Sequence, residues 1–484
     1  MFKLLLLATG AGGILLLVGA LLVPEAGTLT FLFVLYMNAA AIASQLYHVP
    51  QWIGGGVIVL IAIPFGVYVF IRGHRVILDS PFAWMLAFLV ASLLSTYISR
   101  DPVLALQWIF TYVSEGVLLY LLVINTVRVL PVLRRALWVL ITAGAVLGSL
   151  SLYQEVTGSY ARQFGGLAQR NIEGAEAPGQ EASGQDAAVK VRLENRAAGP
   201  IGDPNRYAQI LIVLLPMALL RFRAEQRRAL KLLAGLAALL ILGGIVLTYS
   251  RGALLALAFL ALAMAALRYI RWRDLLVAPA VAIVLALIAG PRMLARMDTI
   301  TTVPGLLENS GSGPVEADGA IRGRLTEMLA AYKVFRDYPI LGVGPGLYAR
   351  LYSVDYMDNT FKAIGGVRRA HDLYVEWAAE TGTLGIIVFL VIVGVVSHRL
   401  WRARRFWLRT HPPSADLATS FLLCLMAYLT TALFLHLSYQ RYYWLLLALA
   451  GATAQILRSP AELRATTAKR LLPRRVRQPA VQTW

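Results

Sequence analysis

The sequence predicts an all-α, polytopic integral membrane protein with about 12 transmembrane helices and one large, partly helical outer loop. Of its 484 residues, 58% are hydrophobic and only 15% are charged, whereas soluble domains are about half apolar and a quarter charged. The basic residues stand in short clusters between the apolar runs. The positive-inside rule therefore accounts for the net charge of +19, and nucleic-acid binding is not needed to explain it.

The apolar runs are long enough to cross a bilayer, which needs about 20 residues per helix. The single cysteine, Cys424, lies inside one run, so disulfides and cysteine metal sites are excluded. Residues 4–23 could imitate a signal peptide, but with so many later runs a first transmembrane helix is the better interpretation. The candidate spans are 4–23, 28–44, 54–71, 82–98, 103–126, 136–155, 205–220, 230–248, 253–268, 275–290, 374–397, 416–436 and 442–457.

Basic clusters fall at every second loop and set the predicted orientation, with these loops in the cytoplasm. If every candidate were a span, the N-terminus would lie outside. Lys3 and the small residues of 28–44 argue instead that 28–44 is interfacial or re-entrant, which leaves both ends inside. The clusters are Arg72/Arg75, Arg128/Arg134/Arg135, Arg221/Arg223/Arg227/Arg228, Arg268/Arg271/Arg273, Arg399/Arg402/Arg404/Arg405/Arg409 and Lys469/Arg470/Arg474/Arg475/Arg477.

Two long loops then face outward. The predicted organisation is transmembrane helices over 1–290 with an outer loop at about 156–203, a large outer loop over 291–372 that holds the active site, transmembrane helices over 373–457, and a basic cytoplasmic tail over 458–484. In the larger loop, the apolar spacing of residues 322–336 predicts a helix that ends before Pro339. Residues 342–346, with three glycines, predict a tight turn.

Many arginines of the outer loops break the positive-inside rule. For about half of them a solvated surface is a sufficient explanation, because long loops cross the membrane regardless of charge. Arg251 differs, because it belongs to a four-residue connection between two apolar helices and stays close to the membrane surface. The planar guanidinium suits a phosphate or carboxylate. These arginines therefore favour a lipid-linked phosphate or diphosphate as ligand, and anchoring of Arg251 to lipid headgroups is the alternative.

His371 stands where the large outer loop enters an apolar span, two positions after Arg369 and three after Arg368. Neighbouring positive charge lowers the pKa of a histidine and favours the neutral imidazole, which can accept a proton. A structural histidine is the alternative. The other histidines are assigned to solvated basic clusters or, for His48 and His436, to interfacial packing.

Metal and nucleotide chemistry have little support in the sequence. Asp355-x-x-Asp358 is a poor magnesium pattern, and the outer loops contain no Asp-x-Asp or His-x-x-x-His spacing. Walker loops and Gly-x-Ser-x-Gly elbows are missing from the exposed segments. Glu115, inside a span, is expected to pair internally, with a transport role as the alternative. We therefore predict neither a metal nor a cofactor.

Four segments, taken together and in order, resemble the O-antigen ligase (WaaL) family within the wider ligase and polymerase superfamily. Residues 202–208 resemble its G-x-x-N-x-x-A helix start, and residues 248–252 its T-x-S-R-G hairpin. Arg324 followed by residues 337–346 resembles its R…D-x-P-hydrophobic-x-G-x-G-x-G run. Residues 371–385 resemble H-N-x-Y…E-x-G-x-x-G, with Asp372 in place of the frequent asparagine. The resemblance covers roughly residues 195–397.

The resemblance implies a GT-C-like glycosyltransferase in the bacterial inner membrane, with periplasmic outer loops and a periplasmic active site. The donor would be a glycan on undecaprenyl diphosphate, and the acceptor a sugar hydroxyl of lipid A–core. Arg251 and Arg324 would hold the diphosphate, and His371 would serve the acceptor hydroxyl. Because arginines can neutralise the charge on the leaving diphosphate, we expect the transfer to be independent of metal. We expect a single displacement, which inverts the configuration of the anomeric carbon. Further expected substrate-binding residues are Arg322, Arg206, Asn205, Arg368, Arg369 and Tyr374.

Three alternatives stay open at this point. An O-antigen polymerase and a protein O-oligosaccharyltransferase share the pattern and differ in the acceptor. A transporter of lipid-linked glycans would also have a basic cavity, but its charges would be spread through the spans, whereas these arginines collect outside.

Overall fold

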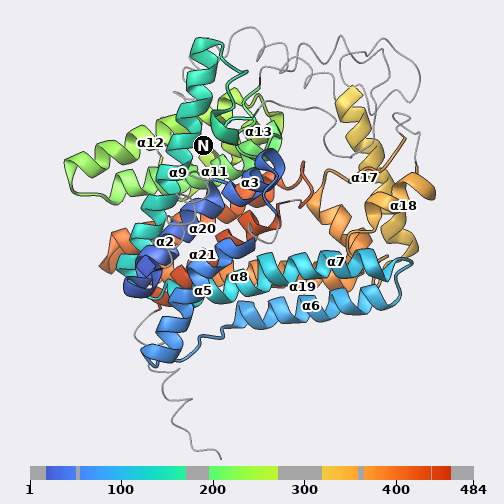
Figure 1. Ribbon diagram of the computed structural model, residues 1–484, viewed down its shortest axis with the longest axis horizontal. Coiled ribbons are helices and arrows are strands. Elements are labelled where there is room, and N and C mark those ends of the chain that lie inside the picture. Colours follow the sequence, from blue (N-terminus) through green and yellow to red (C-terminus); the bar gives the residue numbers. More distant parts are fainter. Residues whose placement is uncertain are drawn as a thin grey trace, which may run out of the picture.

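The computed structural model describes residues 18–50, 55–169, 196–270, 319–357, 365–437 and 439–458. Within these ranges the regular elements are all helices (Figure 1), so the predicted all-α class is confirmed. Seven of the described helices are long and apolar enough to cross a membrane: α6 (Ser80–Tyr97), α7 with its continuation through α8 (Pro102–Thr126), α9 (Leu130–Thr157), α11 (Pro204–Ala224), α12 (Arg228–Leu247), α19 (Leu373–Thr410) and α20 (Pro412–Thr431). Each coincides with a predicted span.

The segment predicted to be interfacial or re-entrant is broken. Helices α2 (Pro24–Tyr36) and α3 (Ala39–Tyr47) meet at a bend of 51°, as a broken span or a re-entrant loop does. Shorter apolar helices occupy Gly56–Ile71, with α5 (Val59–Gly66) at its centre, and α13 (Arg251–Ala266). The last helix, α21, covers Gln440–Ile456. Residues 4–17, the span at 275–290 and the tail beyond 458 lie outside the described residues, so the total of about 12 spans stays a prediction.

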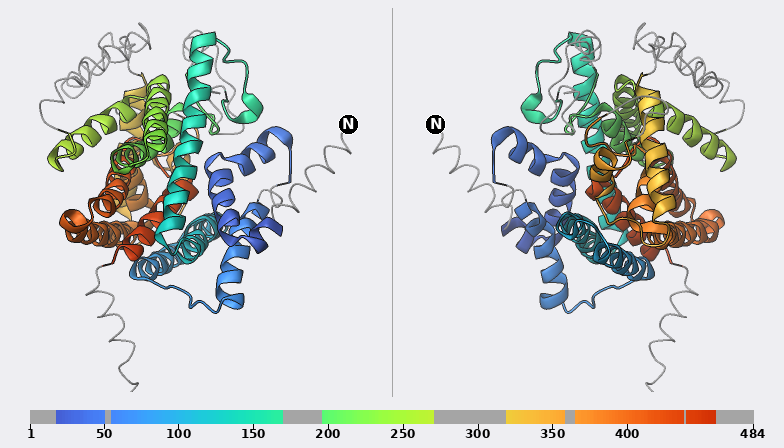
Figure 2. Two further views of the ribbon diagram at one scale, coloured as in Figure 1. Left: turned by 90° about the vertical axis from the view of Figure 1, so that its left-hand side faces the viewer. Right: turned by 90° about the vertical axis from the view of Figure 1, so that its right-hand side faces the viewer.

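Helices α11 and α20 lie at the centre of the bundle. Side chains of α11 are buried around nearly its whole circumference from Tyr207 to Met217, as expected for a helix that is apolar on all sides. It packs against α9, α12, α13 and α20, and α20 in turn packs against α13, α19 and α21. Figure 2 shows α9 standing between the N-terminal helices and the pair α11 and α12. A core helix fixed on every side gives its N-terminal end, near Asn205, a defined position.

The basic clusters of separate loops meet at one end of the helices. Contacts there include Arg128 with the carbonyl of Arg75 at 2.9 Å, Arg399 with Asp79 at 3.2 Å, and Arg223 with Asp416 at 3.6 Å. These groups stand at the C-terminal ends of α8 and α11, within the C-terminal part of α19, and at the start of α6 and α20. The shared end is the arrangement that the positive-inside rule predicts for a cytoplasmic face.

Two helices of the segment predicted to be the large outer loop lie at the other end. Helix α17 (Gly319–Asp337) and α18 (Tyr348–Val354) stand beside the ends of α6, α7 and α19 (Figure 1). Helix α17 confirms the helix predicted over 322–336. The predicted turn is also present, and Gly342, Gly344 and Gly346 all have positive φ.

The turn is hydrogen-bonded to a break in α19. Val343 N donates to Ala379 O and Gly344 N to Glu380 O, both at 3.0 Å. Two residues later, Gly382 has φ 65° and ψ −169°, a conformation essentially restricted to glycine. The break divides α19 into a short outer piece that begins at Leu373 and a long inner piece.

Replacing Gly382 with alanine should destabilise the protein by at least about 1–3 kcal/mol from backbone strain alone. A Cβ there would lie 2.2 Å from Ile340 O and 2.3 Å from Ile340 C, so the turn would have to move as well. Thermal unfolding of the purified protein measures the loss. Gly394→Ala, in the same helix with nothing within 4 Å of its Cβ, is the matched control. Equal melting temperatures for the two variants would contradict the assignment.

Candidate active site

Segments that are distant in sequence meet around one small cavity at the end of the bundle opposite the basic clusters. Its walls come from the N-terminal ends of α11 and α13, from α17, and from the chain that follows α20. The open volume is about 10 Å³, room for about one water molecule. The lining residues are Asn205, Ser250, Gly252, Ala253, Arg324, Thr431, Phe434 and Leu435. Three of the four motif segments are therefore adjacent in space.

The N-terminus of α13 opens onto this cavity. Helix α12 ends at Leu247 and α13 begins at Arg251, so the connection is as short as the sequence predicts. Ser250, the N-cap residue, makes no side-chain hydrogen bond to the first turn. A helix N-terminus carries partial positive charge and N–H donors. Together with Arg324, which lines the cavity, it forms a site suited to an anion, and Arg251 is the first residue of that helix.

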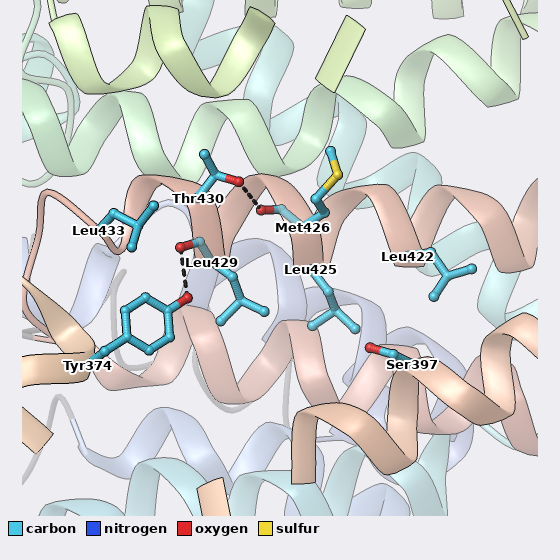
Figure 3. A pocket seen from close by; sticks show the side chains of 8 residues that line it. All are labelled: Tyr374, Ser397, Leu422, Leu425, Met426, Leu429, Thr430 and Leu433. Atoms are coloured by element: carbon cyan, nitrogen blue, oxygen red, sulfur yellow. Dashed lines mark hydrogen bonds between the residues drawn. The ribbon is translucent and has the colours of Figure 1, made fainter. Parts of the chain in front are cut away.

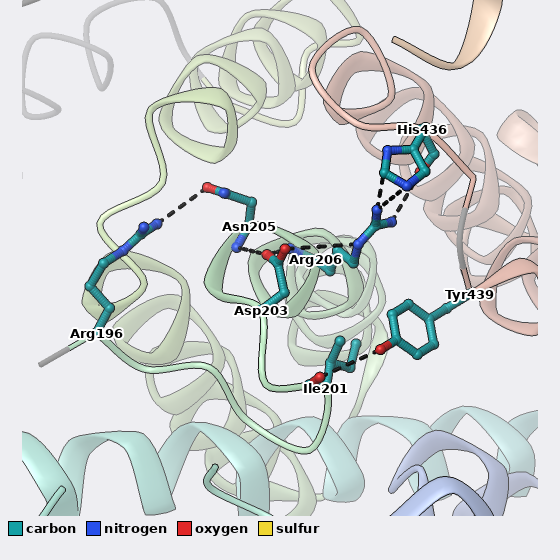
Figure 4. A network of polar contacts seen from close by, with 7 residues as sticks. All are labelled: Arg196, Ile201, Asp203, Asn205, Arg206, His436 and Tyr439. Carbon is teal, nitrogen blue, oxygen red and sulfur yellow. Dashed lines mark hydrogen bonds and ion pairs between the residues drawn. The ribbon is translucent and has the colours of Figure 1, made fainter. Parts of the chain in front are cut away.

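Arg196 connects the motif at residues 202–208 with the motif at residues 248–252, and both motifs line the cavity. Its Nε donates to Thr248 O at 2.8 Å, and its terminal nitrogen donates to Asn205 Oδ1 at 3.3 Å. Asp203 caps α11 by accepting from the backbone N–H of Asn205 (2.7 Å) and Arg206 (3.0 Å) (Figure 4). The start of α11 and the α12–α13 connection are thereby held in one position.

Arg206 is buried and turned toward His436. It donates to His436 O at 3.0 Å and to a ring nitrogen at 2.6 Å, and it lies over the Tyr439 ring at 5.7 Å (Figure 4). A guanidinium can only donate, so the His436 ring nitrogen accepts and the imidazole is neutral. Arg206 thus holds the chain after α20 in place. Direct contact between Arg206 and substrate stays a prediction.

His371 precedes α19 in a left-handed conformation, with φ 50°. Asp372 next to it is the N-cap, because its Oδ1 accepts from Tyr374 N (2.8 Å) and Val375 N (2.9 Å). An aspartate fills this position as well as the asparagine frequent in the motif. The His371 ring packs edge-on against His436 at 5.4 Å, and Nε2 lies 3.6 Å from Glu327 Oε2 on α17.

Burial and positive charge keep His371 neutral. Burial is the largest cause, followed by Arg324, Arg206, Arg368 and Arg369, and together they lower the pKa of His371 to about 3. Glu327 nearby acts in the opposite direction but does not outweigh them. The result agrees with the expectation that arginines beside this histidine favour the neutral imidazole.

The remaining predicted residues take different positions. Arg369 forms an ion pair with Glu376, a fully buried carboxylate that also accepts from Ala370 N at 2.8 Å. This pair fixes the segment just before His371. Arg368 is partly exposed and reaches Gly365 O at 3.4 Å. Arg322 is half-buried on α17, one turn before Thr326, whose hydroxyl donates to Arg322 O.

Tyr374 lies in an apolar groove between α19 and α20. Its hydroxyl donates to Leu429 O at 2.9 Å (Figure 3). The groove has a volume of about 360 Å³, and its other lining residues are Ser397, Leu422, Leu425, Met426, Leu429, Thr430 and Leu433. At one end of the groove, Tyr374 is three residues after His371 in the sequence. Leu433 of the groove directly precedes Phe434, which lines the small cavity.

Sequence reasoning missed three residues of this site. Glu327 follows Arg324 by three positions on one helix, and that spacing is a signal that could have placed it on the same face. His436 was expected in interfacial packing, yet its ring contacts His371. Arg196 was one of many loop arginines, and its spacing to Asn205 carries no signal. In the part of the chain that the structure describes, no three His, Cys, Asp or Glu side chains gather as a metal site requires.

The fold is that of a polytopic helical membrane protein, and the cavity lies where its long helices meet α17. Residues 236–390 match the family model described as O-Antigen ligase, and this match places that stretch, with Arg251, Arg324 and His371 inside it, in the O-antigen ligase superfamily. The predicted resemblance to the superfamily is thereby confirmed over these residues, and the match supports glycosyl transfer of the ligase or polymerase type. The comparison with curated proteins finds no match.

Proposed function

We propose that this protein ligates O-antigen polysaccharide from undecaprenyl diphosphate onto a sugar hydroxyl of lipid A–core. The observation that carries the proposal is the cavity where Arg324, Asn205 and the N-terminus of α13 meet. This cavity offers an anion the donors it needs, and His371 is within the electrostatic reach of Arg324. The site lies opposite the basic clusters, so a cytoplasmic location for those clusters puts the site in the periplasm of a bacterial inner membrane.

The donor would bind in two parts. Its diphosphate would take the place beside Arg251 and Arg324, with Arg322 close by on α17. Its isoprenoid chain would lie in the groove between α19 and α20, which is apolar and begins beside the cavity at Leu433. A lipid chain in a membrane groove needs no polar partners, whereas a diphosphate needs several. The two surfaces therefore match the two chemistries of one donor molecule.

Transfer would proceed as a single displacement. The acceptor hydroxyl, held at His371, attacks the anomeric carbon while the bond from that carbon to the diphosphate oxygen breaks. Arginines stabilise the charge that develops on the departing diphosphate. A retaining route would need a carboxylate nucleophile at the anomeric carbon. Glu376 is committed to Arg369, and Asp372 caps α19.

The other candidates use the same site with a different acceptor. A polymerase would place a second lipid-linked glycan at His371, and a protein oligosaccharyltransferase would place a serine or threonine there. A transporter would move its ligand through charges distributed along the spans. In the described spans the acidic Glu115 is paired with Arg441 at 2.9 Å, which leaves the transport alternative without that residue.

The purified protein, incubated with an undecaprenyl-diphosphate-linked glycan, should transfer it to lipid A–core and not to a peptide or a second lipid-linked glycan. The three acceptors are supplied separately, and products are resolved by gel and mass spectrometry. Elongation of the lipid-linked glycan alone would identify a polymerase. The absence of transfer to all three, with the donor bound, would contradict glycosyl transfer.

In the same assay, activity should persist in excess EDTA and the product should have the inverted anomeric configuration. Arginines can supply the charge neutralisation that a metal would otherwise give. Anomeric configuration is read by NMR of donor and product. Loss of activity with rescue by Mg²⁺ or Mn²⁺ would contradict metal independence, and a retained configuration would contradict the single displacement.

A further inference from the structure

His371 and Glu327 face each other across a gap that suits a hydroxyl. Nε2 of the histidine lies 3.6 Å from Oε2 of the glutamate, with side-chain exposures of 17% and 4%. The separation exceeds the usual length of a direct hydrogen bond, about 2.7–3.2 Å. An oxygen atom can stand about 2.8 Å from both atoms at once. The phenol of Tyr348 donates to Glu327 O at 2.5 Å, which fixes this turn of α17.

The geometry assigns the proton of the neutral imidazole to Nε2. Nδ1 is buried and has no hydrogen-bond partner among the described residues. A proton on Nδ1 would leave a buried donor unpaired, at a cost of about 1–3 kcal/mol. It would also turn the lone pair of Nε2 toward a carboxylate oxygen. With the proton on Nε2, the nitrogen that faces the gap is a donor.

The surroundings make this imidazole a poor proton acceptor. Arg324, Arg206, Arg368 and Arg369 all act on the ring, and the neutral His436 packs against it. Each arginine opposes a positive charge on His371. Protonation of a buried imidazole creates a charge, whereas protonation of the buried carboxylate of Glu327 removes one, so burial favours the proton on the carboxylate. Of the two side chains that face the gap, Glu327 is therefore the better proton acceptor and His371 the better hydrogen-bond donor.

We propose that Glu327 is the general base of the transfer and that His371 positions the acceptor hydroxyl by donating from Nε2 to its oxygen. This inference rests on the proposed glycosyl transfer. The hydroxyl O–H bond breaks and its proton goes to Glu327 Oε2. The bond from the hydroxyl oxygen to the anomeric carbon forms, and the bond from that carbon to the diphosphate oxygen breaks with its electron pair. The products are the glycosylated acceptor and undecaprenyl diphosphate.

The test compares Glu327→Gln with His371→Gln in the full-length protein. Glutamine at 327 keeps the size of the side chain but cannot take the proton, so transfer should fall by about 10²–10⁴-fold while the affinity for undecaprenyl diphosphate stays unchanged. Glutamine at 371 keeps an N–H donor and should lose less activity than His371→Ala. Asp355→Asn, which removes an exposed carboxylate paired with Arg100, is the matched control.

The outcomes separate the inference from the function on which it rests. Glu327→Gln near the wild-type rate, with His371→Gln as inactive as His371→Ala, would make His371 the base and overturn the inference alone. Wild-type protein that binds donor but transfers to no acceptor would overturn the proposed function. Thermal unfolding reports whether each variant is folded. Glu327→Asp, which retains a carboxylate, should exceed the rate of Glu327→Gln, and the reverse order would also overturn the inference.

Discussion

The protein with His371 replaced by alanine should bind the lipid-linked donor but transfer glycan about 10²-fold more slowly than the wild type, the cost of a misplaced acceptor. Alanine removes the ring nitrogen that faces Glu327 and with it the contact that holds the acceptor hydroxyl. The proposed diphosphate site at Arg324 and the N-terminus of α13 is built from other residues, so donor affinity should change little. Initial transfer rates and a thermal shift with undecaprenyl diphosphate measure the two properties separately.

The backbone at His371 requires its own control. With φ at 50°, alanine tolerates this position less well than histidine or asparagine does, so alanine lowers stability to some extent. His371→Asn tolerates this conformation and should fold as well as the wild type. His74→Ala, an exposed histidine near the basic clusters, should retain full activity. Transfer near the wild-type rate in a folded His371→Ala protein would remove His371 from the mechanism.

Replacing Arg251 or Arg324 with alanine should weaken donor binding and transfer together. A hydrogen bond to a charged group is worth about 1.5–3 kcal/mol, which corresponds to about 10–10²-fold. Lysine at either position keeps the charge but loses the planar fork. Impaired lysine variants would therefore indicate that geometry matters as well as charge. Donor affinity is measured by the thermal shift, and transfer by initial rates.

Arg336→Ala is the matched control for these arginines. It lies on α17 like Arg324 but is exposed and paired with its neighbour Asp337 at 3.2 Å. Its removal should leave donor affinity unchanged, because surface ion pairs contribute little. Full activity in both Arg251→Ala and Arg324→Ala would leave an anionic donor without these ligands.

Much of the fold follows from the lengths of apolar runs. Seven predicted spans coincide with helices of sufficient length, because an uninterrupted apolar run has no better structure in a bilayer. The helix over 322–336 was predictable from its spacing and from Pro339. The left-handed break at Gly382 was not, because it depends on the approach of Ile340 from another segment. The residues next to Gly382 in the sequence do not indicate that contact with Ile340.

More residues of the candidate site were predicted from the positions of charged side chains relative to the apolar runs than from the spacing of residues along helices. Arg251 and His371 were singled out because charges near a bilayer are costly to keep, and Arg324 was singled out by the resemblance to the family motif. The structure brings Arg324 and His371 within one electrostatic environment, together with Arg206 and Arg369. Glu327 and His436 come into contact with His371 only because α17 packs against α19 and the chain after α20 folds back. Such tertiary neighbours cannot be read from one sequence without an alignment of relatives.

The break in α19 also sets the height at which chemistry can occur. Gly382 and Arg399 are 17 positions apart in one helix, a rise of about 26 Å, close to the roughly 30 Å thickness of a hydrocarbon layer. With Arg399 at one boundary of that layer, Gly382 lies near the other, and the short helical piece that begins after His371 lies beyond Gly382 in the same element. An acceptor hydroxyl must then reach a plane close to the lipid headgroups. For the proposed transfer, this height would select acceptors by the distance of their reactive sugar from the membrane as well as by its chemistry.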